Sequence, residues 1–175
     1  MRRLILFRHA KSDWPQGVAD HDRPLASRGR AQAPVMGAYL ASEMLVPDLA
    51  IVSTALRAQE TWRLASAAFR EAAPQRDDKR VFAAPAERLL AIAREAPPET
   101  RVLVMVGHNP GFHEAAARFV GHGDRYAFAR MRAKFPTSAL AVLDFAVDGW
   151  GDIDWRAGRL DRFVTPKSLG GEDAD

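Results

Sequence analysis

Residues 4–14 read LILFRHAKSDW, and this stretch decides the fold. Its first four residues, Leu4–Phe7, are all apolar, without the alternation expected of a strand that has one face in water. Such a run predicts a strand buried on both faces, as in the parallel sheet of an α/β protein. The strand leads directly into Arg8 and His9. Because a buried charge stripped of its partner costs roughly 3–5 kcal/mol, Arg8 predicts a carboxylate or a bound anion at this strand end.

Further apolar runs predict the rest of the sheet, and segments with helical patterning separate them. Further strands are predicted at Leu49–Val52, Val102–Val106, Ala139–Phe145 and Leu160–Val164, the last at a sheet edge, with a weaker one at Val81–Ala83. Helices are predicted at residues 27–44, at 55–69, from Pro85 to the stop at Pro97-Pro98, and at 109–121. We expect Ser27 and Asn109 to cap the first and last of these helices, and Pro34 to kink the first.

The alternation of strands and helices predicts the fold class, which is α/β. We expect one domain over residues 1–169, with three α/β/α layers and a mostly parallel central sheet covered by helices on both faces. The chain has 175 residues, 47% of them apolar, which is enough for an ordinary core. Residues 170–175, GGEDAD, predict a flexible acidic tail.

Composition and charge limit the chemistry, the compartment and the partners that we expect. The chain has no cysteine, which excludes disulfides, thiol nucleophiles and thiolate metal sites and fits a reducing compartment. The run Leu4–Phe7 is too short for a signal peptide or a membrane span, so we expect a cytoplasmic protein with no membrane partner. The net charge of +3 is spread along the chain among acidic residues, which predicts an anionic substrate or phosphoprotein and no nucleic acid partner.

Three predicted strand ends carry polar residues to one edge of the sheet, where ligands of α/β proteins bind. The first strand ends at Arg8 and His9, the second leads into Ser53 and Arg57, and the third leads into residues 107–110, GHNP. Two arginines and two histidines would converge there, beside helix N-termini that add positive potential. The sequence therefore predicts an anion site suited to phosphate.

Four segments resemble the histidine phosphatase superfamily, which also contains the cofactor-dependent phosphoglycerate mutases. They are residues 8–14 (RHAKSDW), 25–29 (LASRG), 53–61 (STALRAQET) and 106–111 (VGHNPG). They occur in order and at family-like spacing between about residues 4 and 120. The short chain and its Arg-His-Ala and Gly-His-Asn-Pro forms most resemble SixA-type phosphohistidine phosphatases. The resemblance implies a phosphoglycerate mutase-like fold and an enzyme without a cofactor.

The resemblance also implies residue roles. His9 matches the nucleophile that forms a phosphohistidine intermediate, and Arg8, Arg57 and His108 match the other phosphate-pocket residues. Ser12 matches a serine that also touches phosphate. Asn109, which follows the predicted strand Val102–Val106, is a candidate substrate-binding residue. Two departures are Ala10 in place of the usual glycine and Pro15 where mutases commonly have asparagine; the second disfavours a mutase.

The chemistry is consistent with these roles. A neutral imidazole is a competent nucleophile near neutral pH, and Arg8, Arg57 and a protonated His108 can stabilise phosphoryl charge without a metal. The general acid is less clear. Glu87 is a candidate, although a glutamate in the first turn of a helix is commonly a dipole partner; Asp13, Asp20 and Asp22 are alternatives. A phosphoramidate substrate needs less acid assistance, which favours phosphohistidine.

Other functions remain open. An enzyme of this kind could act on a phosphohistidine protein, or as a phosphomonoesterase or mutase on small phosphorylated metabolites. From another class, the chain could be an inactive phosphate- or partner-binding module. A metal hydrolase using His9, His108 and aspartates is a further alternative, but the Asp20-His21-Asp22 spacing matches no metal-ligand motif. The sequence carries no signal for an oligomeric state.

Overall fold

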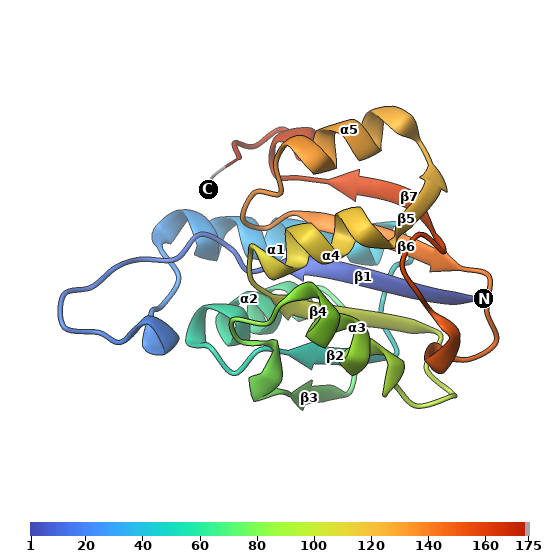
Figure 1. Cartoon of the computed structure of the whole chain (residues 1–175). Helices are drawn as coiled ribbons and strands as arrows, with labels where there is room; N and C mark the ends of the chain where they lie inside the picture. Colours follow the sequence, from blue (N-terminus) through green and yellow to red (C-terminus); the bar gives the residue numbers. More distant parts are fainter. Residues whose placement is uncertain (174–175) are drawn as a thin grey trace.

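The apolar run at the N-terminus is a central strand of one seven-stranded sheet (Figure 1). The structure, a computed structural model, describes residues 1–173. The strands follow the order β3-β2-β4-β1-β6-β7-β5 across the sheet. Their bounds are β1 (Arg2–Arg8), β2 (Leu49–Val52), β3 (Gln75–Asp77), β4 (Val102–Gly107), β5 (Val120–Gly123), β6 (Leu140–Phe145) and β7 (Gly158–Val164).

Five helices cover the two faces of the sheet. They are α1 (Ser27–Ser42), α2 (Leu56–Ser66), α3 (Ala86–Arg94), α4 (Gly111–Phe119) and α5 (Arg125–Ala133). The side chains of β1 alternate between two cores: Ile5 and Phe7 pack with α1 and α2, while Leu4 and Leu6 pack with α3, α4 and α5. The predicted three-layer α/β/α architecture is therefore confirmed, and the uninterrupted apolar run of β1 follows from burial on both faces.

The sheet is mostly parallel, as predicted. β1 pairs in parallel with β4, which pairs in parallel with β2, and these three strands end at the same edge. Among the described strands only β6 runs against the rest, pairing antiparallel with both β1 and β7. The register aligns Arg8 with Gly107 and Val52 with Val106. The residues that follow β1, β2 and β4 therefore start side by side at the same edge of the sheet.

Three elements are missing from the sequence prediction, and two predictions about strands are wrong. β3, β5 and α5 were not predicted. The segment Leu160–Val164 is not an edge, because β5 pairs with the outer side of β7. The segment Val81–Ala83 is not a strand: Lys79–Val81 form a short 3-10 helix, and Ala83 has a left-handed backbone with φ of 52°.

Two predicted helix caps are also wrong. α1 begins at Ser27 itself, with Ala26 in the capping position and no side-chain cap. α4 begins at Gly111 after Pro110, because the side chain of Asn109 is engaged elsewhere: its Nδ2 donates to the carbonyl oxygen of Phe135 at 2.8 Å. Pro34 does lie inside α1, as the sequence requires.

The end of the described chain contacts α1. Glu172 forms an ion pair with Arg28, and its carbonyl oxygen accepts a hydrogen bond from Gln32 at 2.7 Å. The predicted tail continues into residues 174 and 175, which lie outside the described residues, and its flexibility stays a prediction. Within residues 1–173, none of the helices combines the length and apolar character needed to cross a bilayer.

Candidate active site

The ends of β1, β2 and β4 surround a cavity of about 330 Å³. Six of the site residues singled out from the sequence line this cavity: Arg8, His9, Ser12, Arg57, His108 and Asn109. Glu87 and the aspartates named as alternative acids do not line it. Because the three strands are parallel and in register, the residues after them meet at one edge of the sheet.

His9 is held rigidly where it leaves β1. Its backbone N–H donates to the carbonyl oxygen of Gly107 at 2.9 Å, and its own carbonyl oxygen accepts from Ser138 at 3.1 Å. The ring atom Nδ1 lies 2.7 Å from the carbonyl oxygen of Ala10. A carbonyl oxygen can only accept, so Nδ1 carries the proton and the lone pair of the neutral ring sits on Nε2.

The environment of His9 favours its neutral form. The side chain is buried, with the residue 7% exposed. Burial lowers the pKa of His9 well below its usual value, and the neighbouring His108, Arg57 and Arg8 lower it further. Both a fixed tautomer and a depressed pKa therefore leave Nε2 able to act as a nucleophile near neutral pH.

The His108 ring is neutral and contacts the Ser53 hydroxyl. Its Nε2 lies 2.7 Å from the hydroxyl oxygen of Ser53, which also accepts from the backbone N–H of Ala55 at 3.2 Å. When the serine hydroxyl donates to Nε2, the proton of the neutral His108 ring resides on Nδ1. That Nδ1 is buried and has no hydrogen-bond partner, as expected of a group that meets a ligand.

The charge of His108 differs from the protonated form expected from the sequence. Burial, and then the charge of Arg57, lowers the pKa of His108 to about 3. A bound phosphoryl anion would raise that pKa again, because an opposite charge favours the protonated ring. The positive charge at this cavity therefore comes from arginine rather than from His108.

Arg57 stands on the first turn of α2 and is buried. Its Nη1 donates to the carbonyl oxygen of Asp20 at 2.6 Å, and its Nη2 pairs with the Asp20 carboxylate at 3.4 Å. Its Nε is buried without a hydrogen-bond partner. The guanidinium is thus fixed by the Asp20 loop, with donor capacity left for a phosphoryl oxygen.

The carbonyl oxygen of Phe135 organises the opposite side of the cavity. It accepts from Arg8 Nη1 at 2.9 Å and from Asn109 Nδ2 at 2.8 Å. Phe135 follows α5, so this helix, which the sequence did not predict, positions two predicted site residues.

Arg23 is the main cavity residue that the sequence analysis missed. Its three nitrogens donate to the Asp13 carbonyl at 3.0 Å, the Asp20 carboxylate at 3.0 Å and the Ser12 hydroxyl at 2.6 Å. Its guanidinium carbon lies 3.2 Å from the centre of the Trp14 ring. Lys11 and Trp14 also line the cavity. Arg23 lies in an irregular loop. The aspartates near it in the sequence were the only feature that could have pointed to this residue.

A second missed residue, Thr61, ties the backbone next to His9 to α2. The Thr61 hydroxyl accepts from the backbone N–H of Ala10 at 2.9 Å and donates to the carbonyl oxygen of Arg57 at 2.6 Å. Thr61 is fully buried. Its position within the segment 53–61 was the available signal, but spacing alone assigns it no role.

The candidate acids are placed differently. Glu87 does not line the cavity; its carboxylate pairs with Arg118, and its side chain is 64% exposed. Hydrogen bonding from Arg23 is the largest effect lowering the pKa of Asp20, so this carboxyl stays ionised near neutral pH. The Asp13 and Asp22 carboxylates contact Trp14 and His21, respectively.

Metal ligation was considered for His21, which lies between two aspartates. Its Nε2 lies 2.9 Å from the Thr54 hydroxyl, and its ring packs edge-on against Phe82. Residues 1–173 contain no group of three or more histidine, aspartate or glutamate side chains arranged to hold a metal ion.

Comparisons with known proteins found related sequences and structures. The family model of the histidine phosphatase superfamily (branch 1) matches residues 4–81. An uncharacterized protein of Mycobacterium tuberculosis is 35% identical over 163 residues, covering 92% of this chain and 100% of the relative. A structure assigned as phosphohistidine phosphatase SixA from Agrobacterium tumefaciens is 30% identical, with a TM-score of 0.79 over 94% of this chain and 98% of its own. Its counterpart from Nakamurella multipartitia is 25% identical, with a TM-score of 0.83 over 94% and 96%.

Proposed function

This chain belongs to the histidine phosphatase superfamily and has its phosphoglycerate mutase-like fold, and we propose that it is a metal-independent phosphatase whose His9 is transiently phosphorylated. The observation that carries the proposal is the hydrogen bond from His9 Nδ1 to the carbonyl oxygen of Ala10. It leaves the lone pair on Nε2, inside a cavity lined by His108 and three buried or half-buried arginines, Arg8, Arg23 and Arg57.

In the first step, Nε2 of His9 attacks the phosphorus atom. The bond from phosphorus to Nε2 forms while the bond to the leaving group breaks, and the leaving group departs with the bonding electrons. Negative charge on the phosphoryl oxygens is met by the planar forks of Arg8 and Arg57, and by the Nδ1 proton of His108. These groups are fixed before the substrate arrives, so little reorganisation is needed in the transition state.

In the second step, a water molecule attacks the phosphohistidine. The oxygen–phosphorus bond forms, the bond from phosphorus to Nε2 breaks, and the water proton is lost to solvent or to the departing phosphate. His9 returns to its neutral form and inorganic phosphate leaves. Splitting one displacement into two in this way is the usual advantage of covalent catalysis.

We further propose that the physiological substrate is a phosphohistidine carried by a protein. None of the residues that line the cavity in the described chain carries a carboxyl group. An alkoxide leaving group needs a proton from such an acid, whereas the imidazole of phosphohistidine takes a proton readily from water. The likeness to structures assigned as SixA supports the same class of substrate.

Turnover of an aryl phosphate and of N-phosphorylated histidine, measured with and without EDTA, tests the proposal. Both activities should survive EDTA and disappear in His9→Ala, while His122→Ala, at an exposed position outside the cavity, should behave as wild type. Loss of activity to EDTA would indicate a metal hydrolase instead. Turnover of the aryl phosphate with none of phosphohistidine would support a phosphomonoesterase of small metabolites.

A further inference from the structure

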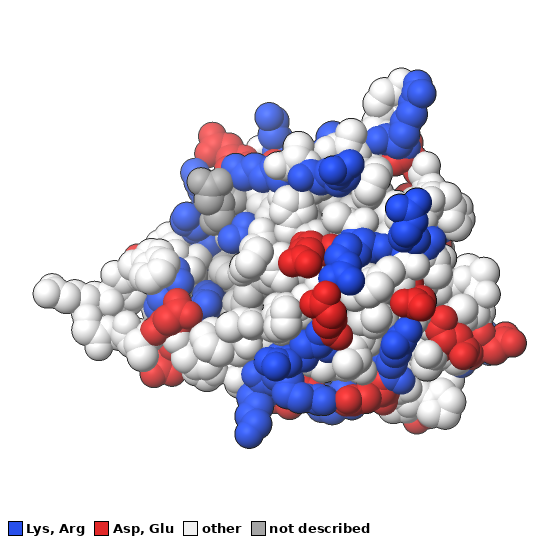
Figure 2. All heavy atoms as spheres, in the orientation of Figure 1, with Lys and Arg blue, Asp and Glu red and all other residues white. Residues whose placement is uncertain are grey.

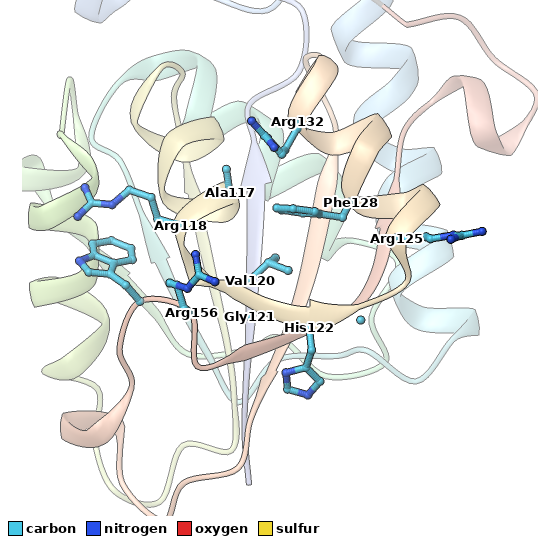
Figure 3. A pocket seen from close by; sticks show the side chains of 11 residues that line it. Ala117, Arg118, Val120, Gly121, His122, Arg125, Phe128, Arg132 and Arg156 are labelled. Carbon is cyan, nitrogen blue, oxygen red and sulfur yellow. The ribbon is translucent and has the colours of Figure 1, made fainter.

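A second hollow lies between α4 and α5, over β5 (Figure 3). Its volume is about 620 Å³, compared with about 330 Å³ for the catalytic cavity. The two share no lining residue. The proposed reaction therefore gives this hollow no role.

The floor of the hollow is apolar. Ala117 and Val120 contribute from α4 and the start of β5, and Figure 3 shows Phe128 reaching toward them from α5. Trp155 closes one side, where its ring packs against Phe119 with 4.6 Å between ring centres. Phe128 and Trp155 are both partly exposed, so aromatic surface is available to a ligand.

The rim of the hollow is cationic. Arg132 and Arg156 line it, both are exposed, and neither has a carboxylate partner within residues 1–173. Arg125 lies at the edge, where its guanidinium contacts the Tyr126 hydroxyl and points away from the hollow in Figure 3. Arg118 pairs with Glu87 and Glu114, and its guanidinium carbon lies 4.1 Å from the centre of the Trp155 ring. Figure 2 shows basic side chains over α4 and α5 on this face. Among residues 1–173, none of those that line the hollow is an aspartate or a glutamate.

Arg156 is held in place by an unusual backbone. Its φ is 60°, in the left-handed region that costs an arginine energy and that glycine or asparagine adopts more easily. Its N–H donates to the carbonyl oxygen of Arg118 at 2.8 Å. A Cβ atom on Gly121 would lie 1.8 Å from the Arg156 carbonyl oxygen. Glycine is therefore required at position 121 for the two backbone segments to pass this close to each other. The surrounding chain thus fixes where Arg156 enters the rim.

We propose that this hollow binds a small organic anion that carries two or more negative charges on a flat apolar body, the chemistry of a nucleoside diphosphate. Arginine forks bind phosphate oxygens in pairs, and the Phe128 ring and the guanidinium planes offer stacking surfaces for a base. The volume lies within the range of small-ligand pockets. A hollow bounded by α4, β5 and α5 favours such a ligand over a protein partner, which requires a broad surface of about 800 Å².

Calorimetric titration with ADP tests this site. Wild type should bind ADP, and the double variant Arg132→Gln/Arg156→Gln should bind it at least about tenfold more weakly through loss of charge-assisted hydrogen bonds. Phe128→Leu, which keeps the side chain apolar but removes the ring, should also weaken ADP binding. The matched control is Arg88→Gln, which removes one exposed arginine of α3 outside the hollow and should have no effect.

Two further titrations locate the bound nucleotide. Arg57→Ala, which alters the catalytic cavity, should leave ADP binding unchanged, and inorganic phosphate alone should bind at least about tenfold more weakly than ADP. The inference is overturned if wild type does not bind ADP at millimolar concentration, or if Arg57→Ala abolishes binding that the double variant retains. An acidic peptide that binds where ADP does not would also overturn it, in favour of a protein-docking surface.

Discussion

The rings of His9 and His108 lie with their centres 5.1 Å apart and their planes tilted by 52°. Two imidazolium ions would repel each other at this distance, in a site that already contains Arg8 and Arg57. Burial and these neighbours lower the pKa of both histidines, so both rings are neutral near neutral pH. The proposed reaction uses one neutral ring as the nucleophile and the other as a hydrogen-bond donor.

The neutral histidines predict how stability depends on pH. In the unfolded chain an imidazole takes a proton below about pH 6.5, whereas folded His108 does so near pH 3. The unfolded state therefore binds more protons between these values, and the free energy of unfolding should fall as pH decreases from 6.5 toward 3. For His108 alone the loss should reach about 2 kcal/mol at pH 5 relative to pH 7.5.

Urea denaturation at pH 7.5, 6 and 5 checks this expectation. His108→Gln should lose less stability than wild type over the same interval, because the variant has no proton to gain at this position. Parallel pH profiles for the two proteins would show that His108 does not contribute.

Arg57→Ala should lower the turnover number by about 10²–10³, the usual cost of removing one preorganised donor from charge that develops on oxygen. Arg57→Lys should recover little, since an ammonium group cannot bind two oxygens as a planar fork does. Steady-state kinetics on an aryl phosphate measures both. Arg63→Ala, an exposed arginine on the same helix, is the control. A decrease below about tenfold in Arg57→Ala would contradict the role assigned to this residue.

Thr61 should act as a positioning residue. Thr61→Val removes the hydroxyl that joins the N–H of Ala10 to the carbonyl of Arg57, leaving a buried N–H unpaired at a cost of about 1–3 kcal/mol in stability. Turnover should also fall, by up to about 100-fold, because the nucleophile is displaced. Thr61→Ser keeps the hydroxyl and should restore both. A stable variant with normal turnover would show that this bridge is dispensable.

Close packing of α1 and α2 gives a prediction for the fold itself. A Cβ atom on Gly37 would lie 2.0 Å from the carbonyl oxygen of Ala65, so Gly37→Ala should destabilise the protein by about 1–3 kcal/mol or more. Thermal unfolding measures the loss. Gly151→Ala, where an added Cβ meets nothing within 4 Å, should change stability by no more than about 0.5 kcal/mol.

The predictable part of the fold is the part buried on both faces. β1, β2 and β4 each contain an uninterrupted run of apolar residues, because the side chains on both faces of these strands are buried. β3, Gln75–Asp77, carries no apolar residue, since it lies at the sheet edge and pairs with β2 alone. α5 buries only Ala127 and Met131 among its nine residues, which leaves too faint a stripe to detect.

The same division holds in the site. His9, Arg57 and His108 follow strand ends, so topology brings them together and the sequence predicts it. Arg23 comes from an irregular loop whose path depends on its contacts with Ser12, Asp13 and Asp20. Those contacts exist only in the folded chain, and no local pattern encodes them.

The most direct test of the central claim is to quench the enzyme during turnover and locate the phosphoryl group by mass spectrometry. The account predicts an acid-labile phosphoryl group on the peptide that contains His9, none on the peptide that contains His108, and none on either in His9→Ala. Phosphorylation at another residue, or turnover that continues in His9→Ala, would contradict it.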